Sequence, residues 1–162
     1  MKFNLLVTGL AALVPTVLGF IWYHPKVLGT VWQKVAGVSD DQIKNANMLV
    51  IFVVSLILSI MLALQINILT IHQFSLGSIV QAKADSEVAK QFVKMGMDNF
   101  GTDFRTFKHG MLHGAIAGLF FMLPILATNA MFERKGFKYI AVNAGYWILT
   151  LMIMGGVICQ FT

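Results

Sequence analysis

Three histidines are the residues in this sequence whose type and spacing best suit metal binding. His109 and His113 are four residues apart, about one turn of a helix, and His72 ends an earlier apolar run. If both runs cross a membrane, the three imidazoles lie on the same side of it. The acid of an HExxH motif is missing, however, and histidines at headgroup level often serve only as polar anchors. We therefore predict no metal site and no cofactor, and we keep these three residues as the candidates.

A second group of residues suits the binding of a lipid or small molecule. Asn129 and Asn143 flank a short charged turn, so both should lie roughly 5–8 Å inside the same interface at 1.5 Å per residue. Aromatic and polar residues at the ends of the other apolar runs lie at the same interface of the membrane. The full candidate pocket is Trp22, Tyr23, His24, Asn47, Asn129, Glu133, Asn143, Tyr146 and Trp147. The same set also fits an aromatic belt with hydrogen bonds between helices, and the sequence leaves both interpretations open.

Catalysis and ion-coupled transport are not favoured by the sequence. The apolar runs contain no ionised residue, whereas coupled carriers usually keep one near the midplane of the membrane. No carboxylate can stand beside a membrane histidine and serine, which excludes a Ser-His-Asp arrangement. Cys159 is the only cysteine, so no disulfide forms within the chain. We predict that the protein is not an enzyme.

The elements that must position these residues follow from the composition. Of the 162 residues, 57% are hydrophobic and 12% are charged, against about 25% charged in soluble domains. Four stretches without Asp, Glu, Lys or Arg are long enough to cross a bilayer, namely 3–23, 48–71, 110–132 and 139–161. The sequence therefore predicts an all-α integral membrane four-helix bundle, forming a single membrane domain over 1–162. The first stretch is longer than the apolar part of a secretory signal, so we expect a retained helix.

Shorter amphipathic helices are expected between the spans. Residues 25–36 alternate at helical spacing and suit a helix lying in the interface. The polar loop 74–108 contains a similar pattern over about 86–97, which suits a surface helix. Ser39 and Gln42 form a capping box that predicts a second helix beginning near Asp40. The third helix is expected to begin near Thr102.

Small residues indicate where helices pack closely. Gly110, Gly114 and Gly118 recur every four residues and leave one face of the third span without side chains. Ala141 and Gly145 give the fourth span a similar, weaker strip. The partner of the glycine face is either the fourth span of the same chain or another subunit. On this basis we expect a homo-oligomer or a subunit of a larger membrane complex.

The charged residues indicate which partners the protein can have and how it is oriented in the membrane. The net charge is +5, and because the charges are scattered we expect anionic lipid headgroups rather than nucleic acid as the partner. Four spans place both termini and the long middle loop on one side. Lysines and arginines divide six to six between the two sides: Lys26, Lys34, Lys44, Arg134, Lys135 and Lys138 oppose Lys2, Lys83, Lys90, Lys94, Arg105 and Lys108. We favour cytoplasmic termini in a multi-pass protein of the cell membrane.

Two motifs resemble those of a known family. The segments GFIWYHPKVLGTVW, residues 19–32, and NAMFERKGFKYIAVNAGYW, residues 129–147, resemble the opening and closing motifs of the bacterial integral membrane family catalogued as domain of unknown function 1761. The resemblance implies a four-helix protein, which we expect in a bacterial inner membrane, and it implies no reaction. According to the resemblance, the residues that belong to the family's motifs are Trp22, Tyr23, Pro25, Asn129, Phe132, Glu133, Asn143, Gly145, Tyr146 and Trp147.

The functional hypothesis from the sequence is a non-enzymatic membrane protein that packs against partners or lipid. We expect it to hold a lipid or small amphiphile near Asn129 and Asn143. The alternative is a small channel or facilitator formed by an oligomer and lined by uncharged polar residues. A membrane-embedded enzyme is the third possibility.

Overall fold

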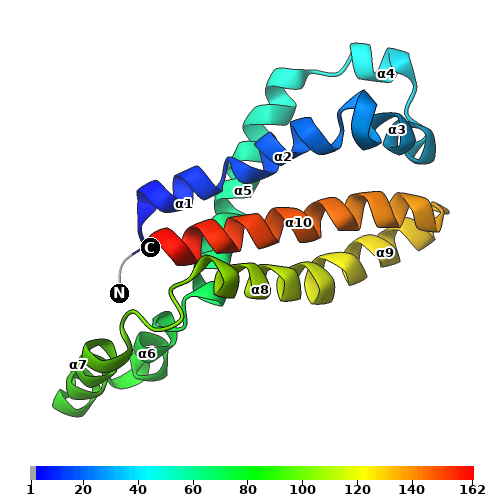
Figure 1. The fold of residues 1–162 in the computed structure, drawn as a ribbon. Coiled ribbons are helices and arrows are strands. Elements are labelled where there is room, and N and C mark those ends of the chain that lie inside the picture. The colour runs from blue at the N-terminus through cyan, green and yellow to red at the C-terminus, as the bar shows by residue number, and fades with distance from the viewer. Residues whose placement is uncertain (1–2) are drawn as a thin grey trace.

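A computed structural model describes residues 3–162 as an all-α protein (Figure 1). Met1 and Lys2, which enter the predicted domain range and the charge count, lie outside the described residues. Four helical segments are long and apolar enough to cross a membrane: Leu5–Trp22, Met48–Thr70, Phe107–Phe132 and Phe137–Phe161. Residues 3–162 contain no strand. The predicted fold class, a membrane bundle of four helices, is confirmed.

The first span is interrupted near its middle. Helix α1 (Leu5–Ala11) begins at Asn4, whose side chain accepts a hydrogen bond from the backbone of Val7 at 3.2 Å. Helix α2 (Val14–Trp22) begins one residue before Pro15, which has no N–H to continue the hydrogen-bond ladder of α1. A π-helical turn, η1 (Pro25–Gly29), and helix α3 (Thr30–Ala36) then occupy the segment expected to lie in the interface.

The second span does not begin where the sequence predicted. Ser39 and Gln42 do form the expected capping box, but the helix that they start, α4 (Asp40–Lys44), is only five residues long. The spanning helix α5 (Met48–Thr70) has its own cap, because the side chain of Asn47 accepts a hydrogen bond from the backbone of Val50 at 3.1 Å. The prediction of one continuous helix from Asp40 was therefore wrong.

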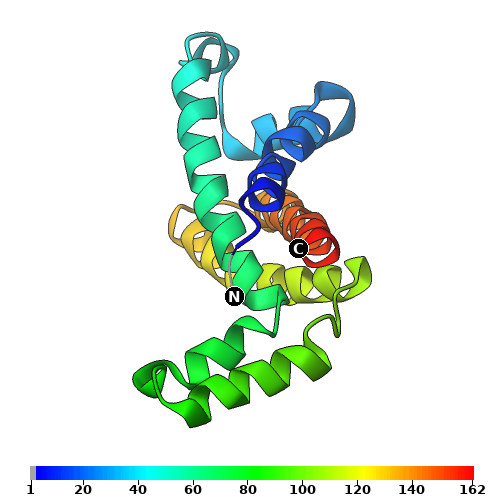
Figure 2. The ribbon, with the colours of Figure 1, turned by 90° about the vertical axis from the view of Figure 1, so that its left-hand side faces the viewer.

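The polar region forms a small helical unit beside the spans. It contains α6 (Phe74–Ile79), the 3-10 turn η2 (Gln81–Lys83) and α7 (Glu87–Phe100), which is capped by the side chain of Ser86. Figure 2 shows α6 and α7 projecting from one end of the bundle. Helix α7 carries the exposed ion pairs Glu87–Lys90 and Lys94–Asp98 on its outer face. The amphipathic segment expected over 86–97 thus forms a longer helix.

The third and fourth spans form a hairpin. The third comprises α8 (Phe107–Ala117), the π-helical turn η3 (Gly118–Met122) and α9 (Leu123–Phe132), and the fourth is α10 (Phe137–Phe161). Helix α8 begins after Thr106, whose backbone is extended at φ −129° and ψ 150° and whose hydroxyl caps His109. The expected start near Thr102 was therefore wrong.

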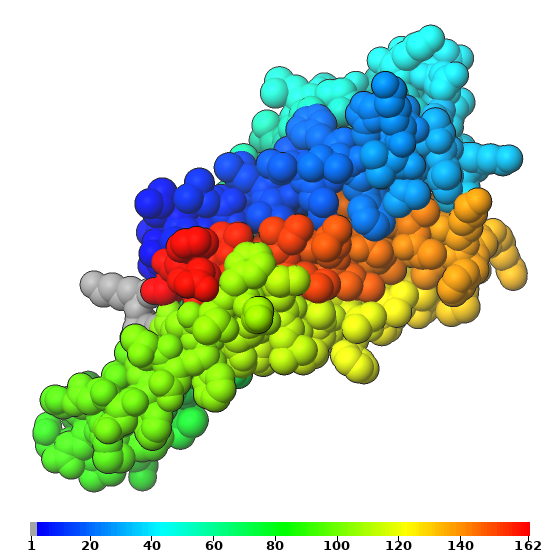
Figure 3. Space-filling model, viewed as in Figure 1, coloured from blue at the N-terminus to red at the C-terminus, as the bar shows by residue number. Residues whose placement is uncertain are grey.

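Helix α10 is the centre of the bundle. It lies between the first and third spans (Figures 1 and 3), and 56% of its most apolar window is buried, against 17–28% for the other three spans. The largest fully buried residues of the core include Ile66, Ile71, Leu151, Met154 and Ile158, which lie toward the end that holds the termini. In contrast, residues 48–58 of α5 all have exposed side chains, so this half of the helix diverges from the bundle.

The turn between α9 and α10 contains a strained residue that gives a direct test of the hairpin. Arg134 has φ 60°, a left-handed conformation that costs a residue with a Cβ about 1 kcal/mol. We expect Arg134→Gly to raise the free energy of unfolding by about 1 kcal/mol in mild detergent. Arg134→Ala keeps the backbone strain and should give no gain, and an equal gain from both variants would contradict the backbone explanation.

Candidate functional site

A groove of about 590 Å³ lies between α2, α5 and α10, in the half of the bundle away from the core. Its walls are mainly apolar, and Phe20 and Phe52 meet across it with their ring centroids 5.5 Å apart. Polar atoms come from Thr16 on α2 and from Ser55 and Ser59 on α5. The groove exists because the exposed half of α5 diverges from α2. The side chains that these helices turn toward it are mostly apolar, with a few polar groups.

The end of the groove is closed by aromatic residues at the end of α2. The ring of Tyr23 lies 5.1 Å from that of Tyr146 and 5.5 Å from that of Trp32, centroid to centroid. The Tyr23 hydroxyl donates a hydrogen bond to Oδ1 of Asn143 at 3.1 Å. Burial, reinforced by the nearby Tyr146 and Tyr139, raises the pKa of Tyr23.

Two further bonds fix α2 against α10. The indole nitrogen of Trp22 donates to the carbonyl of Val142 at 3.1 Å, and the Trp22 ring lies against Gly145. The hydroxyl of Tyr146, a buried residue, donates to the carbonyl of Pro15 at 2.7 Å. Buried Trp and Tyr usually require such partners, so these bonds both satisfy the side chains and hold one wall of the groove in place.

The predicted pocket residues are divided by the structure into two groups. Tyr23, His24, Tyr146 and Trp147 line the groove, and Trp22 and Asn143 support it from behind. The remaining candidates lie elsewhere. Asn47 is exposed and caps α5, while Asn129 and Glu133 are exposed on the α9 side. Because α10 lies between α9 and α2, residues at equal depth on α9 and α2 do not meet (Figure 1).

The α5 wall of the groove was missed by the sequence interpretation, although a signal was present. Ser55 and Ser59 are four residues apart in the otherwise apolar stretch 48–64, so they share one helical face. A further polar contact that was missed lies in the core, where the amide of Asn67 donates to the hydroxyl of Thr8 at 3.1 Å. Asn67 is fully buried, and this bond ties α5 to α1.

The glycine repeat of the third span packs within the chain. A Cβ at Gly110 would overlap the carbonyl oxygen of Gly155, and one at Gly114 would overlap that of Leu151. A Cβ at Gly118 would lie 2.7 Å from the Cα of Ile148. The partner of this face is therefore α10. Of the weaker strip, Gly145 contacts Trp22 and Ala141 is exposed.

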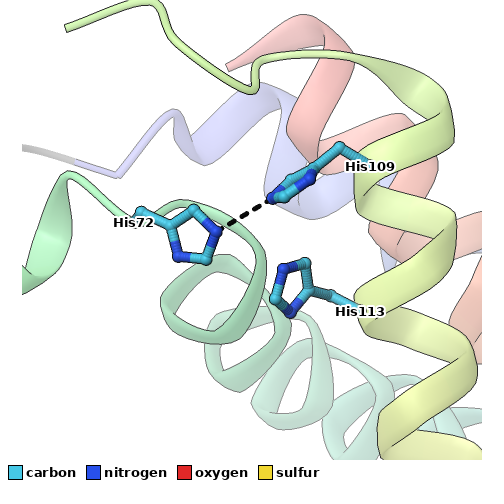
Figure 4. Close-up of side chains that lie close together, drawn as sticks. All are labelled: His72, His109 and His113. Atoms are coloured by element: carbon cyan, nitrogen blue, oxygen red, sulfur yellow. Dashed lines mark hydrogen bonds between the residues drawn. The ribbon is translucent and has the colours of Figure 1, made fainter. Parts of the chain in front are cut away.

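The three candidate histidines come together at the opposite end of the molecule. Ring nitrogens of His72, His109 and His113 all lie within 4.8 Å of one another (Figure 4). The cluster is on the side of the termini and of α6 and α7, whereas the groove ends on the side of α3. The molecule thus contains two separate places where polar side chains converge.

The four apolar helices and the groove between them define a multi-pass α-helical membrane protein. The model of the family described as protein of unknown function (DUF1761) matches residues 6–159, nearly the whole chain, and the chain belongs to that family. No curated protein and no solved structure matches it.

Proposed function

We propose that this protein binds one membrane lipid or similar amphiphile in the groove between α2, α5 and α10, and that it does so without catalysing a reaction. The observation that carries the proposal is the shape and polarity of the groove. Its volume of about 590 Å³ falls within the range of about 300–1,000 Å³ found for small-molecule sites. Its walls along the two spans are mainly apolar, with a few hydroxyl groups from Thr16, Ser55 and Ser59, and its end carries the polar groups of Tyr23 and His24. This distribution suits an amphiphile.

The position of the groove favours a ligand that arrives from the bilayer. Both α2 and α5 belong to candidate spans, and the side chains of residues 48–58 that border the groove are exposed. An acyl chain can therefore enter sideways between the two helices without passing through water. A lipid is already in the bilayer and reaches such an entrance directly, whereas a soluble metabolite would first have to leave water and enter the membrane. A membrane-facing entrance therefore suits a lipid.

The polar end suits a headgroup. Tyr23 and His24 follow the last residue of α2 and lie where the span leaves the membrane. The exposed Lys26 is two residues further along the chain, and the protein has a net charge of +5. A lysine at the membrane surface attracts the headgroups of anionic lipids. We therefore propose that the headgroup of an anionic lipid lies beside Tyr23 and His24, with its chain along Phe20 and Phe52.

A bulky substitution in the α5 wall tests the proposal. Ser55 lines the groove, and Ser55→Trp would fill space that the acyl chain needs. We expect the protein extracted in mild detergent to retain about one lipid per chain, and the variant to lose it. The measurement is the lipid-to-protein ratio by mass spectrometry after extensive washing.

The control is Val54→Trp, which places the same side chain at an exposed position of α5 that does not line the groove. It should retain as much lipid as the unmodified protein. Equal lipid contents in all three proteins would contradict the proposal. If Ser55→Trp changes the mass of the detergent-extracted particle and not its lipid content, the groove is instead an interface between copies.

We further propose that the protein resides in a bacterial inner membrane with cytoplasmic termini. Support for the membrane comes from the four apolar spans and the family membership. The glycine repeat does not support an oligomer, because α10 of the same chain covers the glycine face of the third span. Any homo-oligomer or larger complex would have to form through another surface, such as the exposed half of α5.

A further inference from the structure

The histidine cluster has the geometry of a small cation site. His72 follows α5 directly after Ile71, which is fully buried and fixes the end of that helix, while His109 and His113 project from successive turns of α8. Figure 4 shows the three rings pointing toward one another from these two elements. Nε2 of His72 and Nε2 of His109 are 3.0 Å apart. The ring centroids of the three pairs are separated by 4.6–5.0 Å.

We propose that His72, His109 and His113 together bind a divalent transition metal ion of the Zn²⁺ class. In a tetrahedral site with Zn–N bonds of about 2.0–2.1 Å, ligating nitrogens are about 3.3–3.4 Å apart. The observed 3.0 Å between His72 and His109 is close to that separation. Nitrogens of all three rings lie within 4.8 Å of one another, so small rotations of the side chains bring His113 into place. Three ligands leave the fourth position open to water or an anion.

The donor atoms decide which ions suit the site. Three neutral imidazoles match Zn²⁺, Cu²⁺ or Ni²⁺, whereas Mg²⁺ and Ca²⁺ require mainly oxygen ligands. The thiol of Cys159 is not available to the site, because this residue is fully buried and its Sγ donates to the carbonyls of Phe104 at 3.2 Å and Thr70 at 3.7 Å. The cluster therefore offers a nitrogen-only ligand set of borderline softness.

The surrounding structure holds the imidazoles in position. Gln73, next to His72, is buried, and its amide nitrogen donates to the carbonyls of Phe100 at 2.7 Å and Asp103 at 3.1 Å. Its amide oxygen accepts from Nε of Arg105 at 3.1 Å. These bonds fix the segment that follows α7 directly beside the end of α5. The segment is thereby kept within reach of the cluster.

That segment places an aromatic ring against the histidines. Phe104 has φ 61°, a rare conformation for a residue with a side chain. Its ring lies edge-on to His72 at 5.9 Å and tilted against His109 at 5.1 Å, centroid to centroid. Because apolar groups around a metal site limit the access of water, this ring protects one side of the proposed ligands. His109 and His113 are half-buried, and His72 is exposed despite its contact with this ring.

Zinc titration of the full chain tests the site. The protein is purified in mild detergent without a polyhistidine tag, stripped with a chelator, dialysed, and titrated with Zn²⁺ by calorimetry. We expect one ion per chain. His113→Gln should weaken binding by at least about 100-fold, since even changes to residues behind the ligands weaken metal binding by 10–100-fold. Lys108→Gln changes an exposed residue of α8 that is next to His109 but is not a ligand, and should not weaken zinc binding.

Cobalt gives a second readout that depends on geometry. A tetrahedral Co²⁺ site absorbs strongly in the visible range, and this absorption should appear with the unmodified protein and be absent with His113→Gln. Thermal unfolding of the metal-free variants checks that they are folded, and His72→Gln repeats the test at an exposed side chain. Unmodified protein that binds Zn²⁺ no more tightly than these variants would overturn the proposal, as would an equal loss in Lys108→Gln.

Discussion

Replacing Gly114 by alanine lowers the free energy of unfolding by about 1–3 kcal/mol, the usual effect of forcing extra atoms into a packed interface. The reason is geometric, because a Cβ at this position would overlap the carbonyl oxygen of Leu151 and lie 2.8 Å from the Cα of Met152. These are backbone atoms of α10, which cannot rotate away as a side chain can. Helices α8 and α10 would have to separate along their closest contact. Reversible unfolding in mixed detergents measures the change.

The same substitution at Gly9 should act in the opposite direction. A Cβ at Gly9 would have no neighbouring atom within 4 Å, and alanine is favoured over glycine within a helix by up to about 1 kcal/mol. Gly9→Ala should therefore be neutral or slightly stabilising. If the two alanine variants lose equal stability, helix packing is not the cause and the close contact between α8 and α10 is not what holds the hairpin.

Replacing Gln73 by alanine is expected to have an effect of similar size. The change removes the hydrogen bonds of Gln73 to Phe100, Asp103 and Arg105, and these partners would lose bonds in a partly buried place. A hydrogen bond within a protein contributes about 1 kcal/mol net, so the removal of three should cost about 3 kcal/mol. The segment after α7 should also become accessible to protease.

Limited digestion with trypsin measures this release, because Arg105 lies in the segment and is held by Gln73. Cleavage after Arg105 should become faster in Gln73→Ala. The matched control is Gln91→Ala on α7, where the glutamine is exposed and makes no hydrogen bond within residues 3–162. Unchanged cleavage in Gln73→Ala would show that the segment is positioned by other contacts, such as the bond between Cys159 and the carbonyl of Phe104.

The sequence was sufficient to predict the spans because membranes exclude charge. Runs without charged residues identify membrane helices whatever their packing, so the fold class was predicted and is confirmed. Helix starts were less predictable because several caps competed. Ser39 and Asn47 both act as caps eight residues apart, and only the second one begins the span. Which cap starts the longer helix depends on where the chain turns, and that is decided by tertiary contacts.

The candidate pocket could be predicted only in part, because distance along a helix gives depth and not direction. Asn129 and Asn143 were placed at equal depth, but Asn143 bonds to Tyr23, which directly follows α2, while Asn129 is exposed on the other side of α10. The proximity of the three histidines could be predicted from less information. His109 and His113 share a helical face by spacing alone, and the end of α5 brings His72 to them.

The first span and α5, which border the groove on either side, differ in length, and this difference connects the groove to the thickness of the membrane. The first span has 18 residues and α5 has 23, which correspond to about 27 Å and about 35 Å at 1.5 Å per residue. A bilayer that fits the first span is too thin for an upright α5, which must then tilt. In a thicker bilayer α5 can stand more upright and approach α2. The width of the groove should therefore respond to the acyl-chain length of the surrounding lipids.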